Sequence, residues 1–184
     1  MNTLYYLNSQ GINRQVSVPL HFRKLVDIFH QGGYNSIGQA IHDKLLSFKR
    51  QLYGGDCKWL YIMAHSDKNK GMMAGETIAI NGEKFARMLP PRPERRPELI
   101  FFNTCHAVRT GLVEESLQAG VKTVIATDEA IPIQHMCDYA ETFFRTWLPE
   151  ASSLKEALAK TNAAFAGKDI RFEIFPGPSR MPQR

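Results

Sequence analysis

Apolar and polar positions follow two different periods along the chain, and these periods predict strands and helices in alternation. Short apolar runs predict strands over residues 4–7, 59–64, 77–80, 99–104, 121–126 and 171–175. Apolar positions at helical spacing predict helices over residues 19–29, 36–52, 83–89, 112–119 and 133–147, with one more beginning at Ser152 or Ser153. Strands alternating with helices predict an α/β fold with three layers, in which helices cover both faces of a mostly parallel sheet.

Local signals mark several helix ends. Gly120 follows the helix over residues 112–119 in the position that a C-terminal glycine cap prefers. Glu156 lies three residues after Ser153, which is the spacing of a capping box. These signals support the predicted boundaries in the second half of the chain.

Size and composition are those of one globular domain, which we assign to residues 1–184. Hydrophobic residues make up 43% of the chain and charged residues 22%, an ordinary balance for a soluble protein. No apolar stretch approaches the roughly 18 to 20 residues that cross a bilayer. The N-terminus lacks the basic start and apolar block of a secretory signal. We therefore expect a cytoplasmic protein with no membrane partner.

The three cysteines, Cys57, Cys105 and Cys137, are odd in number and widely spaced, which argues against a disulfide framework and for a reducing compartment. A metal site would have to combine two of these cysteines with two histidines. The spacing of Cys105, His106, His135 and Cys137 matches no common zinc pattern, so we expect no metal.

The net charge of +5 raises nucleic-acid binding as one class of function. The densest basic cluster, Arg92, Arg95 and Arg96, lies in a proline-rich loop over residues 90–97 without an aromatic residue among the arginines. Because stacking on bases needs aromatic side chains, this loop is not a single-strand platform. Nucleic acid is an unfavoured partner, and steep salt dependence of binding would reveal it.

Two predicted strands end in reactive side chains. The apolar run over residues 59–64 leads into His65, and the run over residues 99–104 leads into Cys105. The 40 residues between them allow one crossover, so both carboxyl ends would meet at one edge of a parallel sheet. A thiol beside an imidazole is the minimum equipment of a cysteine nucleophile.

We expect Cys105 to attack a carbonyl carbon as a thiolate, with His65 returning the proton to the leaving amine. A helix expected to begin near Val108, together with a protonated His65, would lower the pKa of the thiol. The backbone N–H groups of Cys105 and Ser66 would receive the developing oxyanion.

The residues around the cysteine resemble those of a known group of peptidases. Asn103-Thr104-Cys105-His106-Ala107 is similar to the metacaspase stretch Asp-x-Cys-His-Ser-Gly. From about Leu60 to Pro178, an ordered series of segments resembles the CHAT family of bacterial caspase-like domains. The series consists of residues 64–66, 77–82, 99–105, 117–126, 139–144, 152–158 and 172–177.

The resemblance implies a cysteine endopeptidase on a caspase-like α/β/α sandwich, with Cys105 as nucleophile and His65 as general base or acid. It implies a protein substrate, no metal or organic cofactor, and a role in bacterial defence or regulated cell death. Related proteins carry sensing repeats for which these 184 residues have no room. We therefore expect either a separate activator protein or a constitutively competent domain.

Two positions depart from the family pattern. Ser66 stands where glycine usually follows the histidine, so a side chain crowds the oxyanion site. Asn103 stands where metacaspases carry an aspartate that binds a basic substrate side chain. Asp128 and Glu129, which follow the strand over residues 121–126, are candidates to supply the missing negative charge, although such residues are also common in solvated loops.

The main alternative is an interaction module with the same fold and a silent or weak dyad, which the Ser66 substitution favours. A thiol-directed electrophile discriminates the two functions. Selective labelling of Cys105 that is lost in His65→Ala indicates an enzyme, whereas equal, slow labelling of all three cysteines indicates a module.

Overall fold

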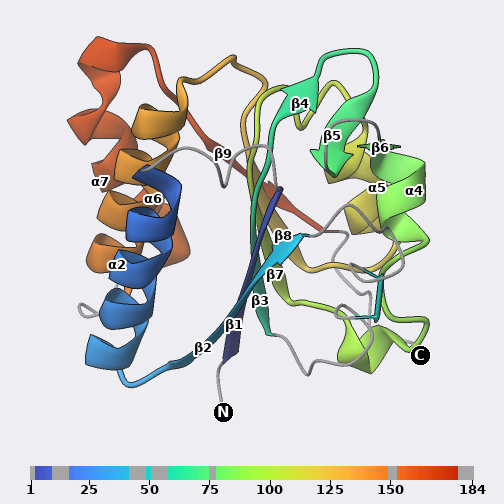
Figure 1. Ribbon diagram of the computed structural model, residues 1–184, viewed down its shortest axis with the longest axis horizontal. Coiled ribbons are helices and arrows are strands. Elements are labelled where there is room, and N and C mark those ends of the chain that lie inside the picture. The colour runs from blue at the N-terminus through green and yellow to red at the C-terminus, as the bar shows by residue number, and fades with distance from the viewer. Residues whose placement is uncertain are drawn as a thin grey trace, which may run out of the picture.

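A six-stranded sheet forms the centre of the computed structural model, which describes residues 3–9, 17–41, 49–50, 58–74, 78–148 and 153–177. The strand order is β2-β1-β3-β7-β8-β9 (Figure 1). The strands are β1 (Thr3–Ser9), β2 (Asn35–Ile41), β3 (Trp59–Met63), β7 (Leu99–Asn103), β8 (Thr123–Ala126) and β9 (Glu173–Pro176). All neighbours pair in parallel except β9, which runs antiparallel to β8. The predicted mostly parallel sheet is confirmed.

Helices cover both faces of this sheet. One face carries α2 (Ser17–Gln31), α6 (Ile133–Trp147) and α7 (Leu154–Ala164). The other carries the short helices α4 (Gly82–Ala86) and α5 (Leu112–Gln118), as Figure 1 shows. Two 3₁₀ turns span Pro93–Arg95 and Ala166–Lys168. The three predicted layers are confirmed.

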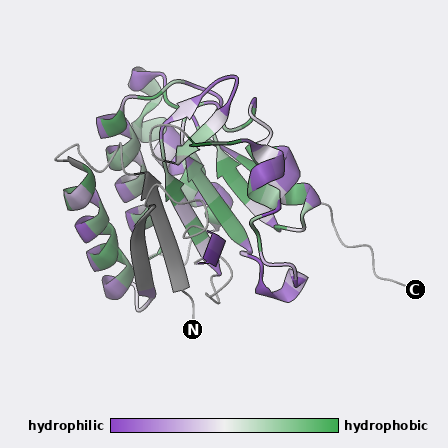
Figure 2. Ribbon diagram, turned by 45° about the vertical axis from the view of Figure 1, so that its right-hand side comes forward, coloured by the Kyte–Doolittle hydropathy of each residue, from purple (hydrophilic) through white to green (hydrophobic). Residues whose placement is uncertain are grey.

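The central strands are apolar on both sides because both sides are buried (Figure 2). Alternate residues of β7 enter separate cores. Phe101 packs on the side of α2 and α6, whereas Ile100 and Phe102 pack on the side of α4 and α5. Strand β3 divides its side chains in the same way, so β3 and β7 are fixed from both sides up to the sheet edge.

Several predicted helix ends agree with the structure. Ser153 and Glu156 form the predicted capping box at the start of α7. Gly120 has φ +93 directly after the last residues of α5, as a C-terminal glycine cap requires. Within the described ranges, no helix has both the length and the hydropathy to span a membrane.

The helix predicted over residues 36–52 is wrong in its first part. Residues 35–41 form β2, which pairs with β1 along its whole length. Ile37 and Ile41 are four residues apart, which suits a helix, but both are also β-branched residues that pack well in a strand. Residues 49–50 are helical, and residues 42–48 and 51–52 lie outside the described part of the chain.

A second, smaller sheet lies beside the carboxyl end of β3. It consists of β4 (Ser66–Asp67), β5 (Gly71–Ala74) and β6 (Ile78–Ile80) in antiparallel order. Only β6 is predicted by the sequence pattern, because the first two strands are short and their residues show no clear alternation. The hairpin from β4 to β5 begins directly after His65, and it therefore fixes the chain on that side of the site.

Candidate active site

His65 and Cys105 follow neighbouring parallel strands at the same edge of the sheet. The register pairs Trp59 with Leu99 and Met63 with Asn103. The pairing ends at Met63 and Asn103, and His65 and Cys105 each follow two residues later, at the same edge of the sheet. His65 is exposed and Cys105 is half-buried.

The sulfur of Cys105 is held by the backbone of Ile131. The Ile131 N–H donates to Sγ at 3.3 Å, and the thiol donates to the Ile131 carbonyl oxygen at 3.7 Å. Burial raises the pKa of the Cys105 thiol, although the hydrogen bond from Ile131 acts in the opposite direction. The sulfur in this arrangement is a neutral thiol at neutral pH, so attack on a carbonyl requires a base.

The expected lowering of the thiol pKa by a helix N-terminus is wrong. Helix α5 begins at Leu112 rather than near Val108, and a turn over residues 104–111 separates it from the sulfur. Since the effect of a helix dipole falls off within the first turn, it does not reach Cys105. The hydrogen bond from the Ile131 N–H is thus a contact that lowers the pKa of the thiol.

Ser66 joins the two strand ends. Its hydroxyl group donates a hydrogen bond to the carbonyl oxygen of Cys105. The Met73 N–H donates to the His65 carbonyl oxygen at 2.7 Å. Because this bond joins the residues that flank Ser66 and Met72, the antiparallel pair Ser66–Met72 is one whose two residues do not hydrogen-bond to each other. The Ser66 N–H consequently lies on the edge of β4 that faces away from β5, as a donor to an oxyanion requires.

The turn after Cys105 is tied to the end of β8. His106 has φ +56, an uncommon value for a residue with a side chain, and its Nδ1 donates to the Asp128 carbonyl oxygen at 2.8 Å. The Ala107 N–H donates to the Thr127 carbonyl oxygen at 3.0 Å. These bonds hold a strained backbone in place next to the thiol.

The two acidic residues predicted to bind substrate differ in their surroundings. The Asp128 carboxylate accepts three hydrogen bonds from Arg109, one from its backbone N–H and two from its guanidinium group. The Arg109 guanidinium group, which belongs to the turn after Cys105, therefore balances much of the negative charge of Asp128. Glu129 is exposed, and its Oε2 accepts a hydrogen bond from the Arg171 N–H at 3.2 Å.

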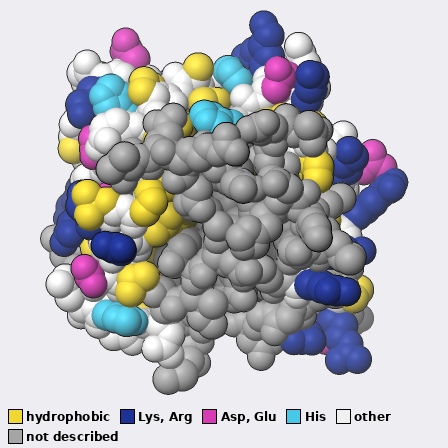
Figure 3. Space-filling model, in the orientation of Figure 1, with side chains coloured by type: hydrophobic (Ala, Val, Ile, Leu, Met, Phe, Trp, Pro, Cys, Tyr) yellow, Lys and Arg dark blue, Asp and Glu magenta, His cyan; other side chains and the backbone are white. Residues whose placement is uncertain are grey.

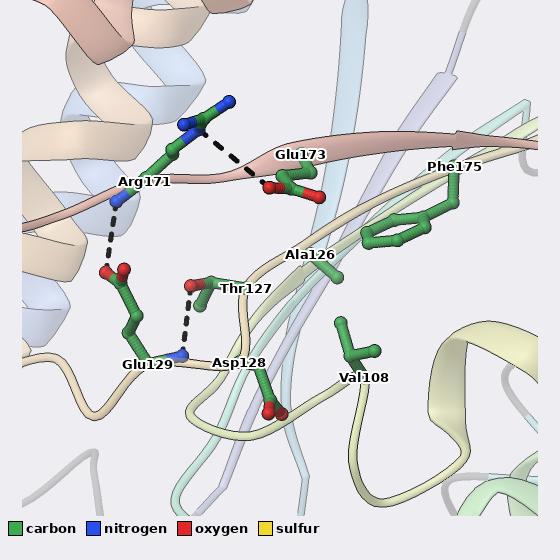
Figure 4. A pocket seen from close by; sticks show the side chains of 8 residues that line it. All are labelled: Val108, Ala126, Thr127, Asp128, Glu129, Arg171, Glu173 and Phe175. Carbon is green, nitrogen blue, oxygen red and sulfur yellow. Dashed lines mark hydrogen bonds and ion pairs between the residues drawn. The ribbon is translucent and has the colours of Figure 1, made fainter.

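A cavity of about 230 Å³ lies between these residues and the end of β9 (Figure 4). Val108 and Phe175 form its apolar side, and charged groups form the other. Its lining consists of Val108, Ala126, Thr127, Asp128, Glu129, Arg171, Glu173 and Phe175. Three of these residues are acidic and one is basic, and the basic one, Arg171, lies 3.8 Å from the Glu173 carboxylate.

Asn103, predicted as a third substrate-binding residue, is 0% exposed. Its Nδ2 donates to the Tyr61 hydroxyl at 2.6 Å and to the Met136 carbonyl oxygen at 2.9 Å. It therefore lies beneath the sheet edge in this structure and does not line the cavity. Its Oδ1 has no hydrogen-bond partner among the described residues.

No local sequence pattern pointed to Ile131, Arg109 or the β4–β5 hairpin as parts of this site. Ile131 is flanked by Ala130 and Pro132, so its apolar character did not distinguish it. In the described part of the chain, no three His, Cys, Asp or Glu side chains are grouped so as to bind a metal ion.

On the face that Figure 3 shows, the described Lys and Arg side chains lie in separate groups around the margin, with acidic side chains among them.

Comparison with known proteins decides the fold. The structure is similar to the crystal structure of Dronc, an initiator caspase of Drosophila, with a TM-score of 0.62. The match covers 95% of this chain and 79% of that chain, at 10% sequence identity. The fold is caspase-like. No protein-family model matches the sequence, and no curated protein resembles it significantly in sequence.

The caspase-like fold accounts for the three layers, the parallel sheet and the helices on both faces. At 10% identity, the likeness concerns the fold and does not extend to the CHAT family, the substrate or the reaction. The function therefore has to be argued from the residues at the carboxyl edge of β3 and β7.

Proposed function

We propose that the chain is a cysteine endopeptidase that cleaves a protein partner through Cys105 and His65. The observation that carries the proposal is that His65 and Cys105 follow the neighbouring parallel strands β3 and β7, each two residues after the last paired residues, Met63 and Asn103. Open α/β sheets bind their ligands at this edge, outside the carboxyl ends of the parallel strands. A soluble protein of the cytoplasm, acting in bacterial defence or regulated cell death, is the setting that we propose for it.

The proposed reaction begins when Sγ exchanges its contacts with Ile131 for His65. His65 takes the thiol proton, and the thiolate attacks the carbonyl carbon of a peptide bond. The N–H groups of Ser66 and Cys105 donate to the resulting oxyanion. His65 then gives the proton to the leaving amine, and a thioester at Cys105 remains. Water, deprotonated by His65, hydrolyses the thioester and restores the thiol.

The contact between Cys105 and Ile131 indicates how activity could be controlled. A thiol that is hydrogen-bonded by the backbone and half-buried reacts slowly until the connection over residues 127–132 shifts. Binding of a substrate or of a separate activator protein at this connection would supply the shift. We propose such a partner as the trigger.

A peptide-library cleavage assay tests the proposed activity. The wild-type chain is compared with Cys105→Ala and with the matched variant Cys137→Ala, which removes a buried thiol of α6. We expect cleavage by the wild type and by Cys137→Ala, and none by Cys105→Ala. Cleavage that persists without Cys105 would exclude the proposed nucleophile.

The cavity beside Glu129 leads to a prediction about the preferred side chain. We expect Glu129→Gln to reduce the preference for Lys or Arg over neutral side chains by about threefold, because it removes one partly screened charge. Glutamine keeps an oxygen that accepts the Arg171 N–H. The measurement is the ratio of kcat/KM for matched peptides, with exposed Glu114→Gln as the control. An unchanged ratio would remove Glu129 from the substrate site.

An interaction module with a weak dyad is the second candidate function. The half-buried, neutral thiol and the Ser66 side chain beside the oxyanion site favour it. A module would bind its partner equally well with and without Cys105, and neither form would cleave that partner.

A further inference from the structure

A chain of buried polar side chains runs beneath the candidate site. Asn103 Nδ2 donates to the Tyr61 hydroxyl at 2.6 Å, and that hydroxyl lies 3.0 Å from His21 Nε2. His21 Nδ1 lies 2.9 Å from Glu141 Oε1. Glu141 also accepts a hydrogen bond from Lys24 at 3.1 Å. We call Asn103, Tyr61, His21 and Glu141 the buried chain.

The protons of the buried chain have one consistent arrangement when His21 is neutral. The Tyr61 hydroxyl accepts from Asn103, and its own proton goes to His21 Nε2. His21 Nδ1 then carries a proton that it donates to Glu141. Burial alone raises the pKa of Glu141, but the hydrogen bonds from His21 and Lys24 outweigh it and lower that pKa. Glu141 is thus a carboxylate that accepts at both oxygens.

The buried chain connects the elements that hold the dyad. Tyr61 belongs to β3, which leads to His65, and Asn103 ends β7, two residues before Cys105. The second Asn103 hydrogen bond goes to Met136 in the first turns of α6. That helix follows the connection that contains Ile131, the residue bonded to the sulfur.

An unpaired atom indicates that Asn103 is not there for stability alone. Asn103 Oδ1 is buried and has no partner in the described residues. A buried polar atom without a partner is less stable than a paired one, and an apolar side chain at this position would avoid that cost. The two hydrogen bonds that Asn103 Nδ2 donates join β7 to β3 and to α6. An apolar residue could not make these bonds.

We infer that Tyr61 and Asn103 are positioning residues, which hold the carboxyl ends of β3 and β7 together and so set the positions of His65 and Cys105 relative to each other. The inference rests on the proposed peptidase activity for its consequence, but the alignment itself can be measured without a substrate. Neither side chain reaches the surface, since both are 0% exposed.

The test compares two substitutions that each remove one buried hydroxyl. Tyr61→Phe breaks the buried chain between Asn103 and His21 and retains the ring packing against Phe101. Tyr139→Phe is the matched control, because the Tyr139 hydroxyl is bonded to Asn162 Oδ1 at 2.6 Å, away from β3 and β7. Urea unfolding verifies that both variants fold.

The first readout is the pH dependence of Cys105 alkylation by iodoacetamide, followed on the Cys105 peptide by mass spectrometry. We expect the midpoint to move to higher pH in Tyr61→Phe and to stay at the wild-type value in Tyr139→Phe. The second readout is peptide cleavage, where we expect kcat to fall by about tenfold in Tyr61→Phe with KM nearly unchanged.

The two proposals fail in different ways. If the wild type cleaves no peptide through Cys105, the peptidase proposal is wrong. The alkylation midpoints still measure whether the buried chain affects the Cys105 thiol. If Tyr61→Phe and Tyr139→Phe have the same midpoint, the buried chain is structural only and the positioning inference is overturned.

Discussion

Replacing His65 with alanine is expected to lower the turnover number of the proposed peptidase by about a thousandfold. General acid–base catalysis contributes on this scale, and the half-buried thiol of Cys105 has no helix dipole to activate it. Because the His65 side chain is exposed, the loss should leave the free energy of unfolding almost unchanged. The measurement is kcat on a cleaved peptide, together with urea unfolding of the same preparation.

His30→Ala is the matched control for this substitution. His30 is also exposed, but it lies in the last turn of α2, away from the site. We expect the turnover number of His30→Ala to equal that of the wild type. A His65→Ala enzyme that retains more than a tenth of the wild-type turnover would rule out the imidazole as the general base.

Phe101→Ala is expected to destabilise the fold by about 3 to 5 kcal/mol, the usual range for a large aromatic residue in a core. The Phe101 ring is buried and lies at 5.4 Å from Tyr61, 5.4 Å from Phe143 and 5.2 Å from Phe172 between ring centroids. Its removal leaves a cavity in the middle of the aromatic cluster that joins β7 to α6. The measurement is the free energy of unfolding by linear extrapolation in urea.

Leu20→Ala serves as the control, because Leu20 is a large apolar residue that is 53% exposed. Its loss should change the free energy of unfolding by at most about 0.5 kcal/mol. A cost below about 1 kcal/mol for Phe101→Ala would mean that the aromatic cluster does not form as described.

The central strands could be predicted because burial on both faces leaves a strong mark on the sequence. The runs that became β3 and β7 are short, apolar and free of glycine and proline, and few structures other than buried strands fit them. Their order along the chain then suffices to place His65 and Cys105 at one edge. The capping box of α7 is similarly local, since two side chains define it.

The elements at the periphery could not be predicted in the same way. Strand β2 satisfies a helical spacing as well as a strand pattern, and its pairing with β1 decides between them. The β4–β5 hairpin is too short to show a period. Contacts such as those of Ile131 with Cys105 and of His21 with Tyr61 join residues far apart in sequence, so no local pattern reveals them.

The reactive groups of the candidate site could therefore be predicted from the sequence, whereas the contacts around them could not. The sequence pointed to the thiol and the imidazole, but not to the burial that raises the pKa of the thiol or to its backbone contact with Ile131. It also could not separate Asp128, which is paired with Arg109, from Glu129, which is more open to solvent.

Competitive labelling with iodoacetamide tests most directly whether Cys105 and His65 act as a pair. The label at each cysteine is measured by peptide mass spectrometry in the wild type and in His65→Ala. We expect Cys105 to react much faster than Cys137, whose pKa burial raises to about 12, and to lose this advantage in His65→Ala. Equally slow labelling of the cysteines, unchanged by the loss of His65, would contradict the proposed dyad.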